Sequence, residues 1–323
     1  MASSEALLHV IRSDIDASGP ITFARYMELA LYHPELGYYR TRDRFGIAGD
    51  FYTAEQLQPV YGEVVATFVD GLAQTTASPE TFGVLELGAG RAEMKEALAR
   101  RMYRASDWGS PPLPESWTGV VFANEFFDAL PVHLLRKEAT GWSERLVTCC
   151  GNDLRFVTRP LENAELLAYA REYGVHVPEG GEFEASFAVP AWLWRISSML
   201  SDGYLVVIDY GYHERELIRF PAGTLLSYRK HHAAPNTLAN PGMQDITAHV
   251  NFTWFAKCAA AAGLALERSE PLGNWLLSIW GEEELGRRWA RGDQRWRLQW
   301  KQLVFGMGET FRVLQFRRTG HEA

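Results

Sequence analysis

The stretch Val84-Leu85-Glu86-Leu87-Gly88-Ala89-Gly90-Arg91-Ala92 decides the fold class of this chain. An apolar run with one acidic residue ends at two glycines spaced one residue apart, and a segment rich in Ala, Glu and Arg follows over residues 92–100. This order predicts a strand, a tight turn and a helix. Glycine allows the backbone of such a turn to lie against a ligand and to adopt dihedral angles that a side chain forbids. Because Gly-x-Gly is also common in ordinary turns, the pattern alone does not identify the ligand.

The acidic residue of this stretch, Glu86, indicates which ligand the turn would hold. A helix N-terminus that binds pyrophosphate gains nothing from a carboxylate at its mouth, because both groups are negative. A cationic amine or a ribose hydroxyl group would interact favourably with that carboxylate. We therefore expect S-adenosylmethionine (SAM), a sulfonium with an amino-acid tail, rather than NAD. Gly88, Ala89 and Gly90 would lie against this cofactor, and Glu86 would help to hold its amino-acid end.

The composition argues against several classes of protein. The chain has 323 residues and 47% hydrophobic content, which suits one large domain or two smaller ones. Its formal net charge of -8 argues against bulk attraction to nucleic acid. The 3 cysteines have no ligand-like spacing, so we expect no metal site, and they fit a reducing compartment. No apolar run approaches the ~20 residues that cross a bilayer, and Glu5, Asp14 and Asp16 do not suit a targeting peptide, so we expect no membrane contact and a cytoplasmic protein.

Helical patterns precede the glycine turn, and strands alternate with helices after it. The continuous apolar run over residues 204–208 is typical of a strand that is buried on both faces. The sequence therefore predicts an α/β fold with a doubly wound, mostly parallel sheet, whose ligands bind beyond the carboxyl ends of its strands. The predicted elements are helices over 4–17, from about Thr22 and over about 59–73, strands over 84–87, 102–105, 120–123 and 204–208, and a hairpin over 132–137 and 144–157 that turns at 150–153.

Carboxylates lie at the ends of three of the predicted strands, at Glu86, Glu125 and Asp209. Because the carboxyl ends of parallel strands meet at one edge of a sheet, these side chains would share one crevice. Each acid alone is also compatible with a helix cap or a solvated turn. Asp107 lies seventeen residues after Gly90, near the ~20-residue offset at which an acid meets ribose hydroxyl groups in dinucleotide-binding folds. The alternative for Asp107 is a surface turn.

The string Asn124-Glu125-Phe126-Phe127-Asp128-Ala129-Leu130-Pro131 follows the predicted strand over 120–123. Polar groups at a strand end, followed by aromatic residues and a proline, describe a loop that faces a substrate, although Asn124 could also cap a helix. We therefore predict Asn124 and Glu125 as catalytic residues, and Asn124 also as a contact of the cofactor. If the acceptor is a guanidinium, Glu125 could bind it in a planar, bidentate fashion and orient one nitrogen lone pair.

Two further segments each have two interpretations. In a strand, Asp245, Thr247, His249 and Asn251 would share one face and could contact substrate, whereas a solvated strand face or a helix-capping run is the simpler interpretation. Residues 285–300 place three tryptophans near one helical face with arginines around them. This pattern fits a helix that faces the core, or a surface on which bases of a nucleic acid stack.

Several strings, taken together, resemble the MidA-like family of SAM-dependent methyltransferases. Members of that family include a mitochondrial complex I assembly factor that methylates arginine. The strings follow the family order over nearly the whole chain. They are Ile21-Thr22-Phe23-Ala24-Arg25-Tyr26-Met27, Leu31-Tyr32-His33-Pro34, Gly37-Tyr38-Tyr39, Gly49-Asp50-Phe51-Tyr52-Thr53, Glu86-Leu87-Gly88-Ala89-Gly90, the string from Ala123 to Pro131, Ile208-Asp209-Tyr210-Gly211, Gly223-Thr224-Leu225 through Asp245-Ile246-Thr247-Ala248-His249-Val250, and Met307-Gly308-Glu309-Thr310-Phe311.

The resemblance implies a class I, Rossmann-like methyltransferase core with an N-terminal helical segment and a substrate-covering insertion. We place the helical or cap segment at residues 1–75 and the core at 76–323, with insertions at about 140–200 and 212–255. The implied cofactor is SAM, and the implied acceptor is an arginine of a protein substrate. The residues expected to face that substrate are Asp50, Tyr52, Asp128 and His249.

The chain departs from the family pattern at three places, which keep alternative functions open. Ala92 stands where the glycine-rich turn usually has a third glycine, and Asn251 stands where the family usually has Asp. Residues 101–119 are shorter than the family's stretch that carries the ribose-binding acid, so Asp107 is the candidate for that role. The short segment favours a SAM-fold protein that acts as an assembly scaffold. Residues 285–300 would suit an RNA methyltransferase, and a NAD(P)-dependent dehydrogenase is the alternative that the carboxylate before the turn argues against.

Overall fold

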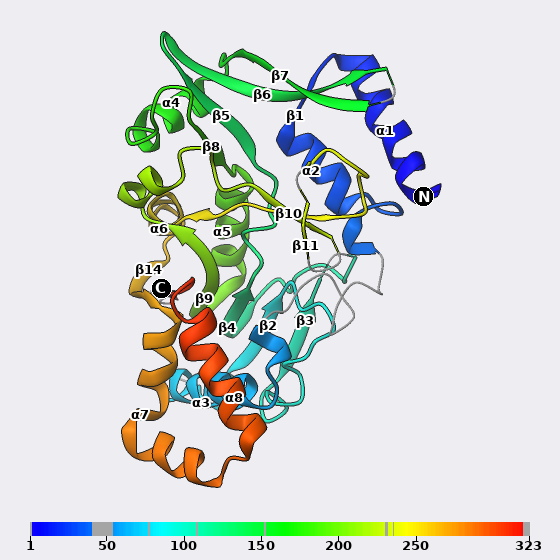
Figure 1. Ribbon diagram of the computed structural model, residues 1–323. Coiled ribbons are helices and arrows are strands. Elements are labelled where there is room, and N and C mark those ends of the chain that lie inside the picture. Colours follow the sequence, from blue (N-terminus) through cyan, green and yellow to red (C-terminus); the bar gives the residue numbers. More distant parts are fainter. Residues whose placement is uncertain are drawn as a thin grey trace. The chain divides into compact units, whose positions relative to one another are not determined.

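The chain folds into two compact units, each assembled from separate stretches of sequence. The computed structural model describes residues 2–40, 54–76, 78–107, 109–151, 153–229, 232–234 and 236–318. Unit 1 consists of Met1–Phe51, Asp128–Val189 and Gly211–Phe255, and unit 2 consists of Tyr52–Phe127, Pro190–Tyr210 and Ala256–Ala323 (Figure 1). The division into residues 1–75 and 76–323 with two insertions stays a prediction.

Unit 2 is built on a sheet whose strands run in the order β14-β15-β9-β4-β2-β3. The pairs β2–β3, β2–β4 and β4–β9 are parallel, and β15 runs antiparallel to both β9 and β14. This arrangement confirms the α/β class and the strands that the apolar runs predict. The strands are β2 (Gly83–Leu87), β3 (Tyr103–Ser106), β4 (Trp117–Asn124), β9 (Leu200–Tyr212), whose last two residues belong to unit 1, β14 (Ala265–Pro271) and β15 (Phe311–Arg318).

Three glycines allow the central strands to lie close together. Gly83, Gly119 and Gly203 are in register across β2, β4 and β9. A Cβ atom on Gly119 would lie 2.1 Å from the carbonyl oxygen of Gly83, and one on Gly203 would lie 1.9 Å from that of Gly119. Both distances are far inside van der Waals contact, so no side chain fits at either position. The glycines therefore fix the spacing of the strands that carry the candidate site.

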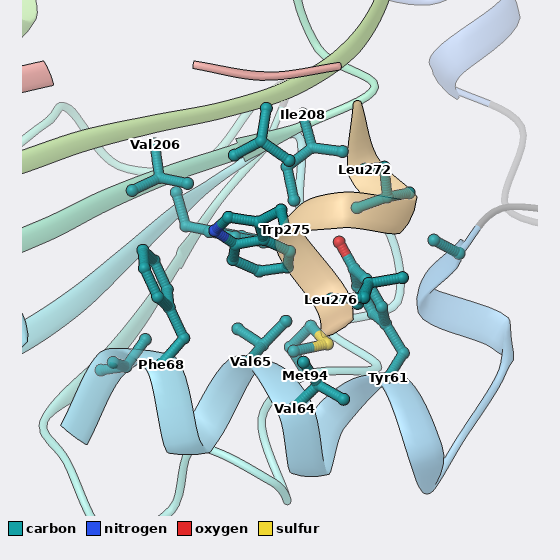
Figure 2. Close-up of a cluster of buried hydrophobic side chains, with 14 of the residues drawn as sticks. Tyr61, Val64, Val65, Phe68, Met94, Val206, Ile208, Leu272, Trp275 and Leu276 are labelled. Carbon is teal, nitrogen blue, oxygen red and sulfur yellow. The ribbon is translucent and has the colours of Figure 1, made fainter. Parts of the chain in front are cut away.

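One face of this sheet is covered by α3 (Val60–Ala73), α7 (Leu272–Arg291) and α8 (Gln294–Lys301). Figure 2 shows Trp275 of α7 between Phe68 of α3 and the strand residues Val206 and Ile208. The Trp275 and Phe68 rings lie 4.8 Å apart between centroids at an interplanar angle of 70°. This edge-to-face contact, together with the burial of both rings, ties the two helices to the sheet.

The tryptophans of residues 285–300 belong to the core or its border. Trp296 and Trp300 are buried and stack with Trp280, with centroid distances of 5.1–6.0 Å among the three rings. Arg288 lies over the Trp280 ring and forms an ion pair with Glu63. Because the stacked faces are occupied by one another, they do not support stacking of RNA bases at this segment.

The helix expected over residues 92–100 is wrong. The segment is a series of turns, in which hydrogen bonds such as Lys95 N to Ala92 O and Leu98 N to Met94 O alternate between three and four residues in span. Ala92 itself has a φ of 57°, in the left-handed region, and a helix cannot continue through such a residue. The Ala- and Glu-rich composition therefore predicts a helix that does not form, and the left-handed backbone excludes Ala92 in particular from one.

Unit 1 contains a second sheet, which includes the predicted hairpin. Its strands are ordered β1-β6-β5-β8, with β7 paired to β6, and Cys150 of β6 pairs with Asp153 of β7, as the predicted hairpin requires. Thr22 caps α2 as expected, since its Oγ1 accepts a hydrogen bond from Arg25 N. The elements are α1 (Ala2–Ser18), β1 (Ile21–Thr22), α2 (Phe23–Tyr32), β5 (His133–Glu138), β6 (Gly141–Cys150), β7 (Asp153–Pro160), α4 (Ala164–Tyr173) and β8 (Glu182–Ala185).

The single strand expected over Asp245 to Asn251 is also wrong. Two short strands, β12 (Asp245–Thr247) and β13 (Val250–Asn251), pair with different partners, β10 (Leu226–Arg229) and β9. The two residues between them donate their N–H groups to non-strand partners, Ala248 to Asp128 O and His249 to Thr224 Oγ1. The four polar side chains therefore do not share one strand face.

The remaining elements complete the two units. No helix among the described residues is long and apolar enough to cross a membrane. The described part of the chain also contains no group of three or more His, Cys, Asp and Glu side chains placed to hold a metal ion. The remaining elements are α5 (Ala188–Met199), α6 (Phe252–Ala261), β11 (His232–Ala233), the 3-10 helices η1 (Tyr38–Arg40), η3 (Ala54–Gln56) and η4 (Glu214–Arg219), and the π-helix η5 (Gln302–Met307).

Replacing Trp275 with Ala should destabilise the protein by about 3–5 kcal/mol, because it leaves a cavity between α3 and the sheet. Chemical denaturation followed by circular dichroism measures this free energy of unfolding. Trp194, whose side chain is 55% exposed, is the matched control, and Trp194→Ala should change stability by no more than about 0.5 kcal/mol. Equal effects of the two substitutions would contradict the packing described for unit 2.

Candidate functional site

The glycine turn lies at the carboxyl end of β2 and is hydrogen-bonded to the end of β3. Gly88 and Gly90 have φ angles of 69° and 50°, in the region that favours glycine. The N–H of Gly88 donates to Ser106 O at 2.8 Å, which fixes the turn against the neighbouring strand. A Cβ atom on Gly88 would lie 3.1 Å from the Phe126 ring, so a side chain at position 88 would have little room. The turn thus has the conformation that the Gly-x-Gly pattern predicts.

Ala92, at the position of the expected third glycine, is strained. Its φ of 57° places a non-glycine residue in the left-handed region, where a Cβ atom costs roughly 1–2 kcal/mol. The described residues contain two other cases outside glycine, Glu125 and Asn240. Two of these three residues, Ala92 and Glu125, therefore lie in the segments that follow β2 and β4. Backbone strain of this kind often marks functional sites.

Glu86 is a buried carboxylate in the strand that leads into this turn. Its side chain is 0% exposed, and its Oε2 accepts a hydrogen bond from the Tyr103 hydroxyl group on β3. The other oxygen, Oε1, is buried and has no hydrogen-bond partner among the described residues. Burial raises the pKa of Glu86 to about 7, against the lowering effect of the Tyr103 hydrogen bond.

Glu55 of η3 brings a second buried carboxyl group to Glu86. It is 7% exposed, and it lies close enough to Glu86 for the two carboxyl groups to influence each other's pKa. Burial, followed by the charge of Glu86, holds the pKa of Glu55 well above its usual range. The sequence interpretation did not select Glu55, and a 3-10 helix of three residues has no periodicity that would have drawn attention to it.

Asn124 and Glu125 at the end of β4 join the same cluster. The Tyr61 hydroxyl group of α3 donates to Asn124 Oδ1 at 2.8 Å, and Asn124 Nδ2 donates to Glu125 Oε1 at 3.3 Å. The backbone N–H of Ala54 donates to the same Glu125 oxygen at 3.4 Å. Burial raises the pKa of Tyr61 well above its usual range, and the neighbouring charges of Glu55, Glu125 and Glu86 raise it further. Three glutamates from three segments therefore surround one tyrosine.

Asp107 follows β3 directly, next to the strand that carries Glu86. It is exposed, and its charge contributes to the raised pKa of Glu86. Its backbone N–H donates a hydrogen bond of 2.9 Å to the Ser110 Oγ. The structure thus brings Asp107 to the edge of the Glu86 cluster, and its ribose-binding role stays a prediction.

The third strand-end carboxylate, Asp209, has a structural role. It is 0% exposed and accepts hydrogen bonds from the N–H groups of Phe127 at 3.0 Å and Tyr210 at 2.9 Å. These bonds hold the loop after β4 to the end of β9. Asp209 is therefore not available to a ligand in the way that Glu86 is.

None of the four predicted substrate-facing residues belongs to the described part of unit 2, for two different reasons. Asp50 and Tyr52 lie outside the described residues. Asp128 and His249 belong to unit 1, in which Asp128 is buried and its carbonyl oxygen accepts the N–H of Ala248. Burial lowers the pKa of His249 to about 4, so its imidazole is neutral at physiological pH. The substrate-facing roles of these residues stay predictions.

The cluster at the ends of β2 and β4 is suited to a cationic ligand. Apart from burial, the groups with the largest effects on the pKa values of Glu55, Tyr61, Glu86 and Tyr103 are all acidic or phenolic. Burying an ionised carboxylate costs free energy when no cation pairs with it, and a bound ligand can provide that cation. The sulfonium and ammonium groups of SAM are cations of this kind, and Glu86 Oε1 is a buried acceptor in need of a donor. The residues present therefore fit SAM.

Comparison with known proteins gives the class of this chain. Residues 91–269 match the model of a family described as "Putative S-adenosyl-L-methionine-dependent methyltransferase". A crystal structure of a COG1565 superfamily member from Burkholderia thailandensis bound to S-adenosyl-homocysteine is 30% identical, with a TM-score of 0.86, and the match covers 98% of this chain and 93% of that one. A native structure of a COG1565 superfamily protein from the same organism gives 30% identity and a TM-score of 0.84, over 98% and 92% of the two chains. The chain belongs to this family of SAM-dependent methyltransferases, and SAM is its cofactor.

Relatives with assigned activities are more distant. The protein named "Protein arginine methyltransferase NDUFAF7, mitochondrial" from Xenopus tropicalis is 27% identical over 324 residues, which cover 82% of this chain and 73% of the relative. Its human counterpart is 27% identical over 315 residues, covering 78% and 68%. The resemblance to MidA-like methyltransferases and the expected cofactor are thus confirmed.

Replacing Ala92 with Gly should stabilise the protein by about 0.5–1 kcal/mol, because glycine adopts the left-handed conformation without a clash. Thermal and chemical denaturation measure the change. Ala99 is exposed and has no left-handed backbone, so Ala99→Gly is the matched control and should leave stability unchanged or lower it. A loss of stability in Ala92→Gly would show that the left-handed conformation at this position is not a source of strain.

Proposed function

We propose that this chain methylates the guanidinium group of a protein arginine, and that its unit 2 is a class I, doubly wound methyltransferase core. The parallel β3-β2-β4-β9 order supports this topology, as does the near-continuous burial of β2, β4 and β9, because open α/β sheets bind ligands beyond the carboxyl ends of their strands. The single observation that carries the proposal is the cluster of Glu55, Glu86 and Glu125 at those ends.

The names of the relatives and the chemistry of Glu125 support arginine as the acceptor. The relatives that match most of the chain are named as protein arginine methyltransferases. A carboxylate binds a guanidinium through two parallel, charge-assisted hydrogen bonds, a geometry that a lysine ammonium does not share. Glu125 stands at a strand end with a strained φ of 50°, which fixes its carboxylate beside Asn124.

The residues of the chain would act mainly by holding the two reactants in line. When bound, SAM supplies an electrophilic methyl group, and transfer to a nitrogen is a displacement that depends on alignment of the donor and acceptor. The backbone of Gly88, Ala89 and Gly90 would lie along the cofactor, Glu86 would pair with its ammonium group, and Asp107 would bind its ribose. Glu125 would hold the guanidinium, with Asn124 keeping the carboxylate in position. The attacked nitrogen would give up one proton to solvent as it gains the methyl group, so the methylated product keeps a single positive charge and S-adenosyl-homocysteine would be released.

The alternatives from the sequence lack comparable support. The short segment over 101–119 still forms β3 and places Asp107 beside the Glu86 cluster, so the feature that favoured a scaffold does not remove the acid from the site. The tryptophans that would serve an RNA methyltransferase pack against one another. Localisation in the cytoplasm stays a prediction.

Replacing Glu125 with Gln should lower the rate of methyl transfer roughly 10²-fold, because the amide cannot carry the charge that pairs with the guanidinium. Transfer of tritiated methyl from SAM to proteins of a cell extract, followed by amino-acid analysis, measures both the rate and the product. Labelled methylarginine is the expected product, and the affinity for SAM should change by no more than about twofold.

The matched control is Glu96→Gln, an exposed glutamate of the same unit, which should keep the wild-type rate. Label in another amino acid or in RNA would contradict arginine as the acceptor. A Glu125→Gln variant with full activity would remove the proposed role of this carboxylate.

A further inference from the structure

We infer that Tyr61 is a positioning residue for Glu125 and that it acts through Asn124. The Tyr61 hydroxyl group fixes the orientation of the Asn124 amide, and the amide in turn holds the Glu125 carboxylate in the orientation in which it meets the guanidinium. This inference rests on the proposed binding of a guanidinium by Glu125. Tyr61 lies within α3, one of the helices that cover the sheet, so no strand-end pattern of the sequence points to it.

Two hydrogen bonds join the three side chains in one direction. The Tyr61 hydroxyl group donates to Asn124 Oδ1 at 2.8 Å, and Asn124 Nδ2 donates to Glu125 Oε1 at 3.3 Å. An ionised carboxylate can only accept hydrogen bonds, so the amide must present its NH2 group to Glu125. Its oxygen then faces Tyr61, which has the hydrogen atom that this oxygen needs. A rotated amide would place two acceptors against each other at Glu125.

The packing of Tyr61 keeps its hydroxyl group in place as a donor. The side chain is 0% exposed and belongs to the core between α3 and the sheet, and Figure 2 shows its oxygen at the end of the ring that points away from the helix. Burial raises the pKa of Tyr61 well above its usual range, and nearby acidic side chains raise it further. The phenol therefore keeps its proton at physiological pH.

Other contacts fix the backbone and the carboxylate of Glu125. Its N–H donates to Ile208 O at 2.9 Å, and its φ of 50° sets the direction in which the side chain leaves the end of β4. The backbone N–H of Ala54 donates to Oε1 at 3.4 Å, so this oxygen accepts from Ala54 as well as from Asn124. Loss of the Asn124 contact would remove one of the bonds that orient the carboxylate. Because methyl transfer depends on alignment of donor and acceptor, this loss should lower the maximal rate more than the affinity for SAM.

The kinetics of Tyr61→Phe test this role, because the substitution keeps the buried ring and removes only the hydroxyl group. The rate of tritiated methyl transfer to proteins of a cell extract, measured against SAM concentration, separates the maximal rate from the KM for SAM. We expect the maximal rate to fall roughly tenfold and the KM for SAM to change by no more than about twofold. Tyr204→Phe is the matched control, since it removes the hydroxyl group of another buried ring of unit 2, hydrogen-bonded to Thr75 Oγ1 at 2.6 Å, and it should keep the wild-type rate.

Variants of Asn124 test whether Tyr61 acts through this amide. Asn124→Ala should lower the maximal rate at least as much as Tyr61→Phe, and the double variant should stay within about twofold of Asn124→Ala alone. Asn124→Asp keeps an oxygen that accepts from Tyr61 but has no NH2 group for Glu125, so its maximal rate should also fall at least roughly tenfold. This variant covers the case of a Tyr61→Phe protein that does not fold.

A maximal rate close to wild type in Tyr61→Phe or Asn124→Asp would overturn the inference, as would a double variant in which the two losses multiply. The same loss of rate in Tyr204→Phe would also overturn it, because any buried hydroxyl contact would then have this effect. These results leave the proposed function intact if Glu125→Gln is slow and the label is in methylarginine. Label in another amino acid, or full activity of Glu125→Gln, would contradict the proposed function and this inference with it.

Discussion

A carboxylate buried without a cationic partner is the constraint around which this site is organised. Glu86 lies in the central strand of unit 2, fully covered, with one hydrogen-bond donor for two oxygens. Its raised pKa means that the ligand-free protein loses stability as the pH rises from the usual carboxyl pKa toward about 7, because the folded state retains a proton that the unfolded state releases. A structure keeps such a group when a bound cation offsets the cost, and the cofactor of this family carries two cationic centres.

The rest of unit 2 places that carboxylate at a turn that backbone atoms can line. The glycines shared by β2, β4 and β9 bring the strands close together, and the helices α3 and α7 hold the sheet through Trp275 and Phe68. The same helix α3 delivers Tyr61 to Asn124 at the end of β4. Helix α3 therefore has two roles: it covers the sheet, and it supplies a hydrogen bond to the site.

Sequence patterns predicted the features of this protein that depend on local order. Apolar runs located β2, β4 and β9, the Gly-x-Gly pattern located the turn, and the departure at Ala92 marked a position whose backbone does require a left-handed conformation. Glu55 was missed because its significance comes from the influence of Glu86, a residue of another segment, which no local pattern encodes. The strand expected around His249 was split for a similar reason, because Asp128 and Thr224, distant in sequence, take the hydrogen bonds that would have continued it.

Calorimetric titration of Glu86→Gln at pH 8 tests most directly whether the charge of Glu86 binds the cofactor. The substitution keeps the shape of the side chain and removes its negative charge. We expect the affinity for SAM to fall at least about tenfold, or about 1.4 kcal/mol, while the affinity for 5′-methylthioadenosine is retained. Unchanged affinity for SAM in a folded Glu86→Gln protein would contradict this role of the charge.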